Sequence, residues 1–254
     1  MAKRVLITGM SGLIGGILKD NLQQVGGYEL TALNRRHVDG VTNFQADIAD
    51  PEAIKPAFEG QDVVVHLAAY LGGSDWEGHH ALNVTGTYNV YEAARLAGVK
   101  RVVFASSNQT FGGFERVSPY SDICAGEYDR VPADFPMITH EQIRPASLYG
   151  ATKVWGEALG RHFSDEYGMS IICVRIGAVR QGDRPTTTRE NSVYLSHRDV
   201  GQALRKSIDA PASVQYDIFN AISDNRWNYR DLTHSKEVIG YVPQDSAENC
   251  PFRP

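Results

Sequence analysis

The stretch Thr8-Gly-Met-Ser-Gly-Leu-Ile-Gly15 decides the fold of this chain. It follows the apolar run Arg4-Val-Leu-Ile7, which predicts a buried strand, and it precedes apolar positions at Leu18, Leu22 and Val25, which predict a helix. A glycine-rich turn between a strand and a helix is the setting of a dinucleotide-binding fingerprint. The spacing is G-x-x-G-x-x-G, one residue longer than the usual G-x-G-x-x-G, and the alternative interpretation is an ordinary βα turn.

The three glycines of this turn have different physical tasks. Gly9 permits the tight turn, Gly12 lets the backbone approach a pyrophosphate, and Gly15 lets the helix pack closely on the strand. The N-terminus of the helix then faces the phosphates. We therefore expect the turn to contact the cofactor through Gly9, Ser11, Gly12, Leu13, Ile14 and Gly15.

The composition is that of a globular protein of 254 residues, with 42% hydrophobic and 22% charged residues. The length suits one large α/β domain or one domain with a small appendage. A net charge of -5 argues against general affinity for nucleic acid, and no apolar run approaches the roughly 18 residues of a membrane span. Cys124, Cys173 and Cys250 are too far apart for a disulfide framework or a zinc site. Because the first strand begins at the N-terminus without a signal peptide, we expect a cytoplasmic protein.

Apolar runs that predict strands alternate with stretches that predict helices. The expected strands are Arg4–Ile7, Tyr28–Leu33, Asp62–Leu67, Arg101–Ala105, Ser170–Ile176 and Gln215–Phe219. The expected helices are Leu13–Val25, Pro51–Phe58, Asp75–Ala97, Ser147–Tyr167 and His197–Ile208. This alternation indicates βαβ units, and hence an α/β Rossmann fold: a doubly wound parallel sheet with helices on both faces.

Two irregular segments interrupt this alternation, at Phe111–Arg144 and at Arg180–Asn191. Long irregular segments in a regular fold are usually functional or mobile. We expect residues 1–176 to form the dinucleotide-binding core, with residues 111–146 as a substrate loop. Residues 177–254 are expected to form a small substrate-binding portion that also returns elements to the core. Ser196 followed by Asp199 predicts a helix cap, which makes Asp199 structural.

Tyr149 and Lys153 form the main candidate catalytic pair. Positions i and i+4 of a helix lie on one face, one turn apart, so the two side chains can act together. An ammonium beside a phenol favours the phenolate and lowers the pKa of the tyrosine. A phenol tuned in this way can take a proton from a substrate hydroxyl or return one. The alternative interpretation of the same spacing is a solvated helix face.

Three further signals lie at the expected carboxyl ends of strands, where ligands bind in sheets of this kind. Asp47 and Ile48 follow the second βα unit, where an acidic side chain can meet an adenine amino group. The small residues of Leu67-Ala-Ala69 leave room for a cofactor against the backbone. The run Ser106–Gln109 is expected to face the pocket that Tyr149 enters.

With these motifs in register, the chain resembles the extended short-chain dehydrogenases/reductases of the NAD-dependent epimerase/dehydratase family. Within that family it is most similar to the uronate dehydrogenases and the haloarchaeal-type glucose-6-phosphate dehydrogenases. The residues that carry this closer resemblance are Tyr91-Glu-Ala-Ala-Arg95, Phe104-Ala-Ser-Ser-Asn108, Leu148-Tyr-Gly150, Val174-Arg-Ile-Gly177, Ala221-Ile-Ser-Asp-Asn225 and Gly240-Tyr-Val-Pro-Gln-Asp245.

The resemblance implies an enzyme that oxidises the anomeric hydroxyl of a small anionic sugar, a uronate or a sugar phosphate, to a lactone with NAD(P). It makes Tyr149 the acid/base, Lys153 the residue that holds the nicotinamide ribose and tunes the tyrosine, and Ser107 the hydrogen-bond partner of the reacting oxygen. The substrate contacts that it implies are Ser107, Asn108, Gln109, Tyr149 and Arg189. Besides the glycine turn, the implied cofactor contacts are Asn34, Arg35, Arg36, Asp47, Ile48, Leu67, Ala68, Ala69, Tyr149, Lys153 and Ile176.

Arg189 is the most specific prediction about the substrate. It stands where the uronate enzymes place the arginine that grips the sugar carboxylate, and an arginine fork suits a carboxylate or a phosphate. The alternative is a solvated loop arginine, since Arg180 and Arg184 lie nearby in the sequence.

Three departures from the uronate pattern are expected to alter the substrate preference. Gln109 stands where those enzymes have a histidine, and Leu71 and Ala178 stand where they have serines. A site that hydrogen-bonds a hydroxyl rejects analogues strongly, so the loss of polar contacts changes which sugar is accepted.

The segment Leu33-Asn-Arg-Arg36 governs the choice of cofactor. An acidic residue at the end of the second strand accepts from the ribose 2′-hydroxyl and repels a 2′-phosphate, which favours NAD. Asn34 occupies that place and is followed by Arg35 and Arg36, so we predict a preference for NADP. The alternative is that both arginines are surface charges and that NAD serves as well.

Two rival functions share these motifs: a nucleotide-sugar epimerase or dehydratase, and a non-catalytic NADP-binding regulator. The first generally carries a larger C-terminal substrate domain than the residues after Ile176 supply. The second tends to lose the tyrosine or the lysine, and both are present here.

No metal site is expected, because the histidines show no paired spacing with carboxylates. The histidines interpreted in this way, as surface or packing residues, are His79, His80, His140 and His162. The expected partner is a small-molecule sugar, without nucleic acid or membrane. The resemblance also implies a homo-oligomer, a dimer or larger, formed through the helix that carries Tyr149 and the helix Asp75–Ala97.

Overall fold

One parallel sheet of seven strands organises the chain, and the computed structural model describes residues 2–252. The strand order is β3-β2-β1-β4-β5-β6-β7, with every neighbouring pair parallel. The strands are β1 (Lys3–Thr8), β2 (Tyr28–Asn34), β3 (Thr42–Gln45), β4 (Val63–His66), β5 (Arg101–Ser107), β6 (Ser170–Ile176) and β7 (Tyr216–Ala221). The order reverses between β1 and β4, which places a crevice for ligands beyond the carboxyl ends of these strands. Residue 1 and residues 253–254, at the ends of the two predicted portions, lie outside the described residues.

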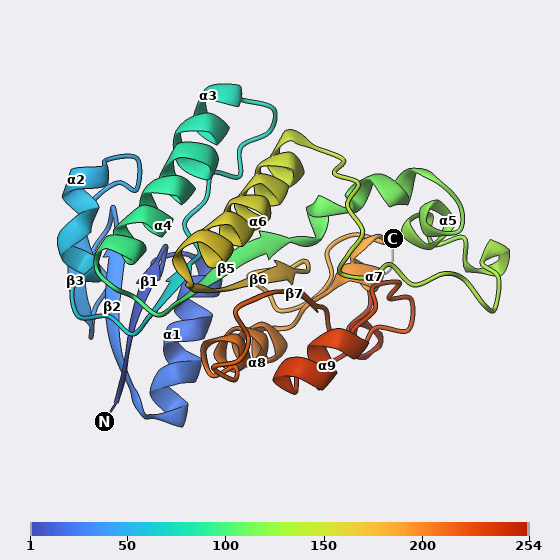
Figure 1. Ribbon diagram of the computed structural model, residues 1–254. Coiled ribbons are helices and arrows are strands. Elements are labelled where there is room, and N and C mark those ends of the chain that lie inside the picture. Colours follow the sequence, from blue (N-terminus) through green and yellow to red (C-terminus); the bar gives the residue numbers. More distant parts are fainter. Residues whose placement is uncertain (1, 253–254) are drawn as a thin grey trace.

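Helices cover both faces of the sheet (Figure 1). α1 (Leu13–Val25), α8 (His197–Ile208) and α9 (Thr233–Ile239) lie on one face, and α2 (Pro51–Ile54), α4 (Gly86–Leu96) and α6 (Leu148–Tyr167) lie on the other. The alternation of side chains along β1 serves both layers. Val5 and Ile7 pack into the core under α1 and α8, while Leu6 packs into the core under α4 and α6. The predicted α/β Rossmann fold is therefore confirmed.

Shorter helices occupy the connections. They are α3 (Trp76–Gly78), α5 (Tyr120–Ala125), α7 (Glu190–Val193) and the 3₁₀ turns Lys55–Phe58, Asn108–Thr110, Gly112–Arg116, Tyr128–Arg130 and Ala247–Asn249. The predicted helix Asp75–Ala97 is one helical run in which α3 passes through the π-helical turn His79–Thr85 into α4. None of the helices within residues 2–252 combines the length and the apolar character that a membrane crossing requires.

Besides the short helices α5 and α7, the strand β3 and the helix α9 were not predicted from the sequence. β3 is a four-residue edge strand without a buried side chain, so it shows no apolar run. α9 spans seven residues, most of them polar, and buries only Ser235 and Ile239. Both elements are too short to produce a period of their own and depend on the sheet for their stability.

Residues 111–146 form a small lobe beside the carboxyl ends of β5 and β6 (Figure 1). Its own apolar cluster is Phe111, Tyr120, Ile123, Ile138 and Tyr229. Because Tyr229 comes from the C-terminal part of the chain, this lobe is tied to residues that follow β7.

The predicted cap of α8 is confirmed. Asp199 N donates to Ser196 Oγ at 3.0 Å, and α8 begins at the next residue after Ser196. The Asp199 carboxylate accepts from Ser223 Oγ at 2.6 Å and from the backbone amides of Gln244 and Asp245. Asp199 thus fixes the C-terminal segment on α8, which is a structural role.

Substitution of Gly15 tests how closely α1 packs on the glycine turn. A methyl group at this position would lie 2.4 Å from Met10 Cα and 2.5 Å from the carbonyl oxygen of Gly9. Because both are backbone atoms, the helix has to shift, so we expect Gly15→Ala to lower the free energy of unfolding by about 1–3 kcal/mol. We expect cofactor affinity to fall as well, since the helix N-terminus moves with it.

Gly16→Ala is the matched control, because within residues 2–252 the added methyl group has no heavy atom within 4 Å apart from the adjoining residues and the backbone of its own helix. It should leave stability unchanged or slightly raised, as expected for alanine in a helix. Denaturant unfolding and a cofactor titration measure both effects. Equal stability of the two variants would contradict the packing argument.

Candidate active site

A cleft of about 1150 Å³ lies along the carboxyl edge of the sheet, and every residue predicted to bind cofactor or substrate lines it. These residues are Gly9, Ser11, Gly12, Leu13, Ile14, Gly15, Asn34, Arg35, Arg36, Asp47, Ile48, Leu67, Ala68, Ala69, Ser107, Asn108, Gln109, Tyr149, Lys153, Ile176 and Arg189. We call the part around the glycine turn the dinucleotide end, and the part around Ser107, Tyr149 and Arg189 the catalytic end. The sequence analysis did not predict Leu33, Ala46, Leu82, Gly177, Val179 and Arg180, which also line the cleft.

The glycine turn brings backbone close to the cleft. Gly9 has φ +73, and a side chain there would lie 2.8 Å from Ala68 N on the neighbouring strand end. Gly12 N donates to the Gly9 carbonyl at 3.0 Å, which closes the turn. α1 starts directly afterwards without a side-chain cap. The N–H groups of its first turn are therefore available to an anionic ligand.

A hydrogen-bonded contact between Thr8 and His66 joins the strand ends beneath the dinucleotide end, and this contact was not predicted from the sequence. The Thr8 hydroxyl contacts His66 Nδ1 at 2.8 Å and accepts from Ala68 N at 3.2 Å, so it joins the ends of β1 and β4. Burial lowers the pKa of His66 to about 3, which keeps the imidazole neutral at physiological pH. No motif marks this contact, because the two residues are brought together only by the pairing of the strands.

Asn34 has an unsatisfied donor that a cofactor can use. Its Oδ1 accepts from Ser11 N at 3.2 Å, whereas its buried Nδ2 has no hydrogen-bond partner within residues 2–252. Such a buried orphan donor is costly unless a ligand oxygen accepts from it. Arg35 and Arg36 are exposed beside it, and Arg35 Nη1 lies 4.0 Å from Asp47 Oδ2. The glycine cradle, the uncapped helix and this donor together fit a nicotinamide dinucleotide.

The catalytic end contains the side chains of Ser107, Tyr149 and Lys153. α6 begins at Leu148, where Ser147 Oγ accepts from Gly150 N at 3.1 Å, so Tyr149 lies in the first turn. Lys153 is buried, and its Nζ donates to the Ala105 carbonyl at 2.7 Å and lies 5.5 Å from the centre of the Tyr149 ring.

The expected lowering of the Tyr149 pKa is not found. Burial raises the pKa of Tyr149 to about 12, and a hydrogen bond with Ser107 opposes that rise. Burial also lowers the pKa of Lys153 to about 8. The ammonium is aimed at the Ala105 carbonyl, so its effect on the phenol is weaker than the spacing alone predicts. With a pKa of about 12, Tyr149 is a neutral phenol at physiological pH.

Glu157 and Arg175 anchor α6 on the sheet, and the sequence analysis missed both. Arg175 Nε and Nη2 each donate to the Glu157 carboxylate at 2.8 Å, and Ser106 Oγ donates to it at 2.5 Å. Both side chains are almost fully buried. Glu157 lies one helical turn after Lys153, and this i, i+4 spacing is a sequence signal that could have identified Glu157.

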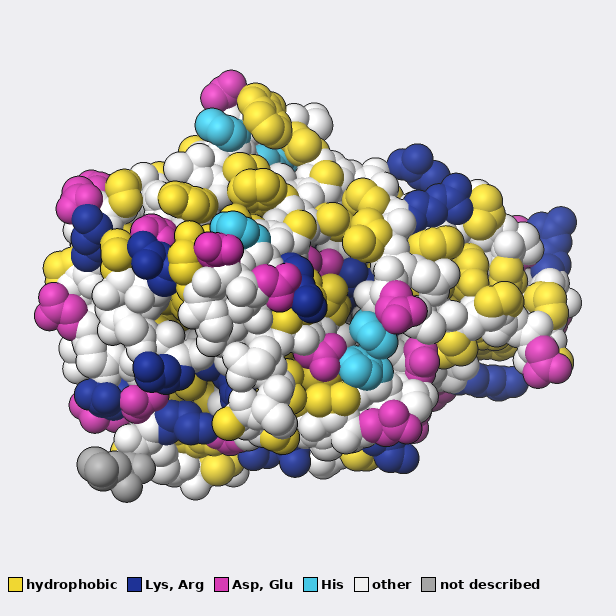
Figure 2. Space-filling model, in the orientation of Figure 1, with side chains coloured by type: hydrophobic (Ala, Val, Ile, Leu, Met, Phe, Trp, Pro, Cys, Tyr) yellow, Lys and Arg dark blue, Asp and Glu magenta, His cyan; other side chains and the backbone are white. Residues whose placement is uncertain are grey.

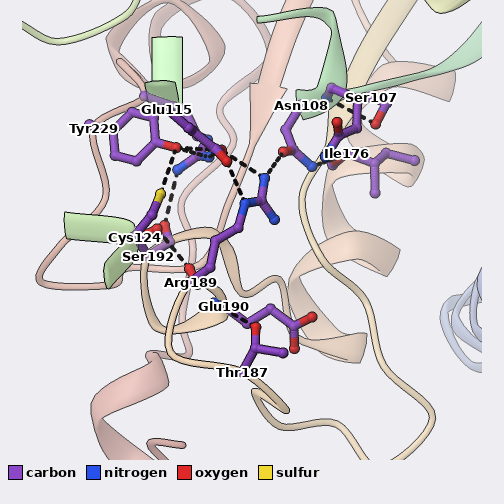
Figure 3. A network of polar contacts seen from close by, with 12 residues as sticks. Ser107, Asn108, Glu115, Cys124, Ile176, Thr187, Arg189, Glu190, Ser192 and Tyr229 are labelled. Carbon is purple, nitrogen blue, oxygen red and sulfur yellow. Dashed lines mark hydrogen bonds and ion pairs between the residues drawn. The ribbon is translucent and has the colours of Figure 1, made fainter. Parts of the chain in front are cut away.

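Arg189 reaches the cleft with its fork already occupied (Figure 3). Its Nε and Nη2 donate to the two carboxylate oxygens of Glu115 at 2.5 and 2.7 Å, and Nη2 also donates to Asn108 Oδ1 at 3.1 Å. Its side chain is 28% exposed, so it is not a solvated loop arginine. Glu115 lies in the irregular segment 111–146, where no periodicity could have predicted this contact.

The three departures from the uronate pattern all lie at the cleft. Gln109, Leu71 and Ala178 line its wall, and Leu71 is 73% exposed. An exposed leucine at the rim offers an apolar surface in the place of a hydroxyl, so the polar character of this wall is reduced.

Two histidines meet a carboxylate away from the cleft, which no sequence spacing had indicated. His234 Nε2 contacts Asp217 Oδ1 at 2.7 Å, and the His140 ring stacks on His234 with centroids 4.0 Å apart and planes 13° apart. The in-plane lone pairs of two parallel rings do not converge on one point, so a cation would require a ring to rotate. His79 is fully buried and packs against Tyr70, as a packing histidine should.

The chain belongs to the NAD dependent epimerase/dehydratase family, whose family model matches residues 5–239. It is 33% identical to the L-arabinose 1-dehydrogenase (NAD(P)(+)) of Haloferax volcanii, over 96% of this chain and 97% of that protein. It is 31% identical to the NAD-dependent glucose-6-phosphate dehydrogenase of the same organism, over 99% and 97%. The crystal structure of uronate dehydrogenase from Agrobacterium tumefaciens superposes with a TM-score of 0.82 at 29% identity, over 98% of this chain and 86% of that one.

These comparisons confirm the resemblance seen in the sequence motifs. The family and its relatives make the chain an NAD(P)-dependent oxidoreductase that acts on CH–OH groups.

Proposed function

We propose that the protein oxidises the anomeric hydroxyl of a small sugar to a lactone, with NAD(P) as the acceptor. The supporting observation is a single cleft that carries the dinucleotide turn at one end and Ser107, Tyr149 and Lys153 at the other. The relatives named above are dehydrogenases of an aldopentose, of a hexose phosphate and of uronates, which agrees with a sugar as the substrate class. An anionic sugar is the substrate that Arg189 alone would favour.

Ser107, Tyr149 and Lys153 have separate roles in the proposed proton transfer. Ser107 hydrogen-bonds the C1 oxygen and holds it next to Tyr149, whose phenolate form receives the hydroxyl proton. Bound nicotinamide supplies the acceptor for the hydride that leaves C1, and the C1–O bond becomes the carbonyl of the lactone. Because burial keeps Tyr149 protonated, the phenol has to lose its own proton before oxidation, so alkaline conditions favour this direction. Lys153 Nζ lies 5.5 Å from the centre of the Tyr149 ring and would hold the nicotinamide ribose when the cofactor is bound.

We also propose that residues 111–146 and residues 177–254 add sugar contacts to the site, while residues 1–176 outside that loop bind the cofactor and carry the residues at the reacting carbon, Ser107 and Tyr149. Glu115 from the first segment and Arg189 from the second meet at the catalytic end, which supports this division. The free cysteines Cys124, Cys173 and Cys250 agree with a reducing, cytoplasmic location.

Tyr149→Phe tests the acid/base role. We expect the turnover number for aldose oxidation to fall by about 10²–10⁴-fold, because the substrate hydroxyl loses its proton acceptor. Cofactor affinity should change little, since the ring is retained. Tyr167→Phe, an exposed tyrosine at the far end of the same helix, is the control and should keep full activity. Unchanged turnover in Tyr149→Phe would show that another group takes the proton.

The cofactor preference is proposed to be NADP, supported by Asn34 in place of an acidic residue and by two exposed arginines beside it. The Asp47 carboxylate near Arg35 opposes this preference, but two cations outnumber one carboxylate. For the double variant Arg35→Ala and Arg36→Ala we expect the KM for NADP to rise about tenfold or more, with the KM for NAD nearly unchanged. Arg161→Ala, an exposed arginine on α6, is the control. A wild-type enzyme that favours NAD more than about tenfold would overturn the proposal.

A homo-oligomer is proposed to form through α4 and α6. Figure 2 shows hydrophobic side chains gathered over α3, α4 and α6, and Tyr88, Trp155 and Trp76 are exposed there by 46%, 41% and 52%. Exposed apolar surface of this kind marks an interaction site. Sedimentation velocity should give a dimer or larger species, and Trp155→Glu should shift it toward the monomer. A wild-type monomer at micromolar concentration would refute this.

A further inference from the structure

Glu115 occupies the part of Arg189 that a substrate carboxylate would need. Two parallel hydrogen bonds from Nε and Nη2 form the bidentate arrangement by which arginine recognises carboxylates. The second hydrogen of Nη2 is directed to Asn108 Oδ1. Within residues 2–252 this leaves Nη1 as the donor that Arg189 can offer to a ligand, and Figure 3 shows it pointing away from the Glu115 contact. One nitrogen can donate to a hydroxyl oxygen but cannot form a fork.

Glu115 is held too firmly to move aside for a substrate. Its carboxylate also accepts from Tyr229 Oη at 2.6 Å and from Arg230 Nη2 at 3.3 Å. Arg230 is fully buried and donates to the Ser192 carbonyl, so it is fixed in turn. Burial alone would raise the pKa of Glu115, but the hydrogen bonds and charges of the two arginines hold it below its usual value. The group is therefore an anion at neutral pH.

Arg180, the second arginine at the catalytic end, is also paired with a carboxylate. Arg180 lines the cleft and pairs with Glu190, whose side chain is 3% exposed and accepts from Thr186 as well. The positive charges of Arg180 and Arg189 are therefore balanced by the negative charges of Glu190 and Glu115. Among the described residues that line this end of the cleft, Lys153 is the remaining cation, and its Nζ donates to the Ala105 carbonyl. Arg230 adds a positive charge but is buried behind Glu115 and does not line the cleft.

From this arrangement we infer that the substrate is an uncharged aldose, and that Glu115 is the residue that sets this specificity by occupying the Arg189 fork. This inference rests on the proposed dehydrogenase function. A sugar carboxylate or phosphate that reached Nη1 would lie within about 4–6 Å of the Glu115 carboxylate, a distance at which like charges repel strongly. A hydroxyl group accepts from Nη1 without that repulsion. The anionic sugar expected from the sequence is therefore disfavoured by a carboxylate that the protein itself supplies.

Two series of sugars isolate the effect of charge at C5 in the wild-type enzyme. D-galacturonate, D-galactose and L-arabinose share the configuration of the other ring carbons and differ in carrying a carboxylate, a hydroxymethyl group or hydrogen at C5. D-glucuronate, D-glucose 6-phosphate, D-glucose and D-xylose form a second series of the same kind. In the series that is oxidised, we expect kcat/KM for an uncharged member to exceed that for the anionic members by about tenfold or more.

Glu115→Gln tests the role of the residue itself. The carboxamide keeps the size of the side chain but removes its charge, so the ratio of kcat/KM for uronate to that for the matching hexose should rise about tenfold or more. Glu92→Gln is the matched control. Arg95 Nε and Nη2 grip Glu92 with the same fork at 2.7 and 2.6 Å, but on α4, outside the cleft, so the ratio should stay within about twofold of wild type.

The outcomes separate this inference from the proposed function. If no sugar in either series is oxidised with NAD or NADP, the proposed function fails. If uronates or the sugar phosphate are preferred by the wild-type enzyme, dehydrogenase function stands and the inference is overturned. An unchanged ratio in a folded Glu115→Gln variant, with a normal unfolding temperature and normal cofactor binding, removes Glu115 as the determinant. If that variant does not fold, the wild-type series alone decides.

Discussion

The ion pair between Glu157 on α6 and Arg175 on β6 is the interaction on which the active site depends. It ties the helix that carries Tyr149 and Lys153 to β6, and the hydrogen bond from Ser106 ties the same carboxylate to β5. Replacing a buried pair of this kind by apolar residues is often neutral in stability, so its value lies in fixing position. Gly156, the neighbouring residue, allows the approach, because a side chain there would lie 2.3 Å from the Phe104 ring.

The two ends of the cleft differ in how their polar groups are satisfied. At the dinucleotide end, the Asn34 amide nitrogen has no acceptor, and the first turn of α1 has no side-chain cap, among the residues that the structure describes. Free donors of this kind are what an anionic cofactor requires. At the catalytic end, Arg189 and Arg180 each hold a carboxylate. The protein thus leaves hydrogen-bond donors free at the dinucleotide end, where the cofactor is expected, and pairs its arginines with carboxylates at the catalytic end, where the sugar is expected. An uncharged aldose can bind at the catalytic end through hydrogen bonds from its hydroxyl groups.

The sequence predicted the sheet, the long helices and the cleft-lining residues because each depends on a local pattern. The glycine turn, the Tyr149–Lys153 spacing and the strand ends that carry Ser107 are all contiguous motifs. The contacts that set the charge of the catalytic end are not local in the sequence. Glu115 and Arg189 are 74 residues apart, and Tyr229 is 114 residues from Glu115. The same reason explains the unpredicted His140–His234–Asp217 cluster, whose members come from the segment 111–146, from α9 and from β7. The tyrosine pKa was also mispredicted, because burial, which no spacing reveals, outweighs the nearby ammonium.

The most direct measurement follows the hydrogen on C1. An aldose that the enzyme turns over is labelled with deuterium at C1 and incubated with oxidised NAD(P), and the products are examined by NMR and mass spectrometry. We expect one deuterium on C4 of the reduced nicotinamide for each lactone formed. Deuterium retained on a sugar of altered configuration, with no net reduction of the cofactor, would contradict it and indicate an epimerase instead.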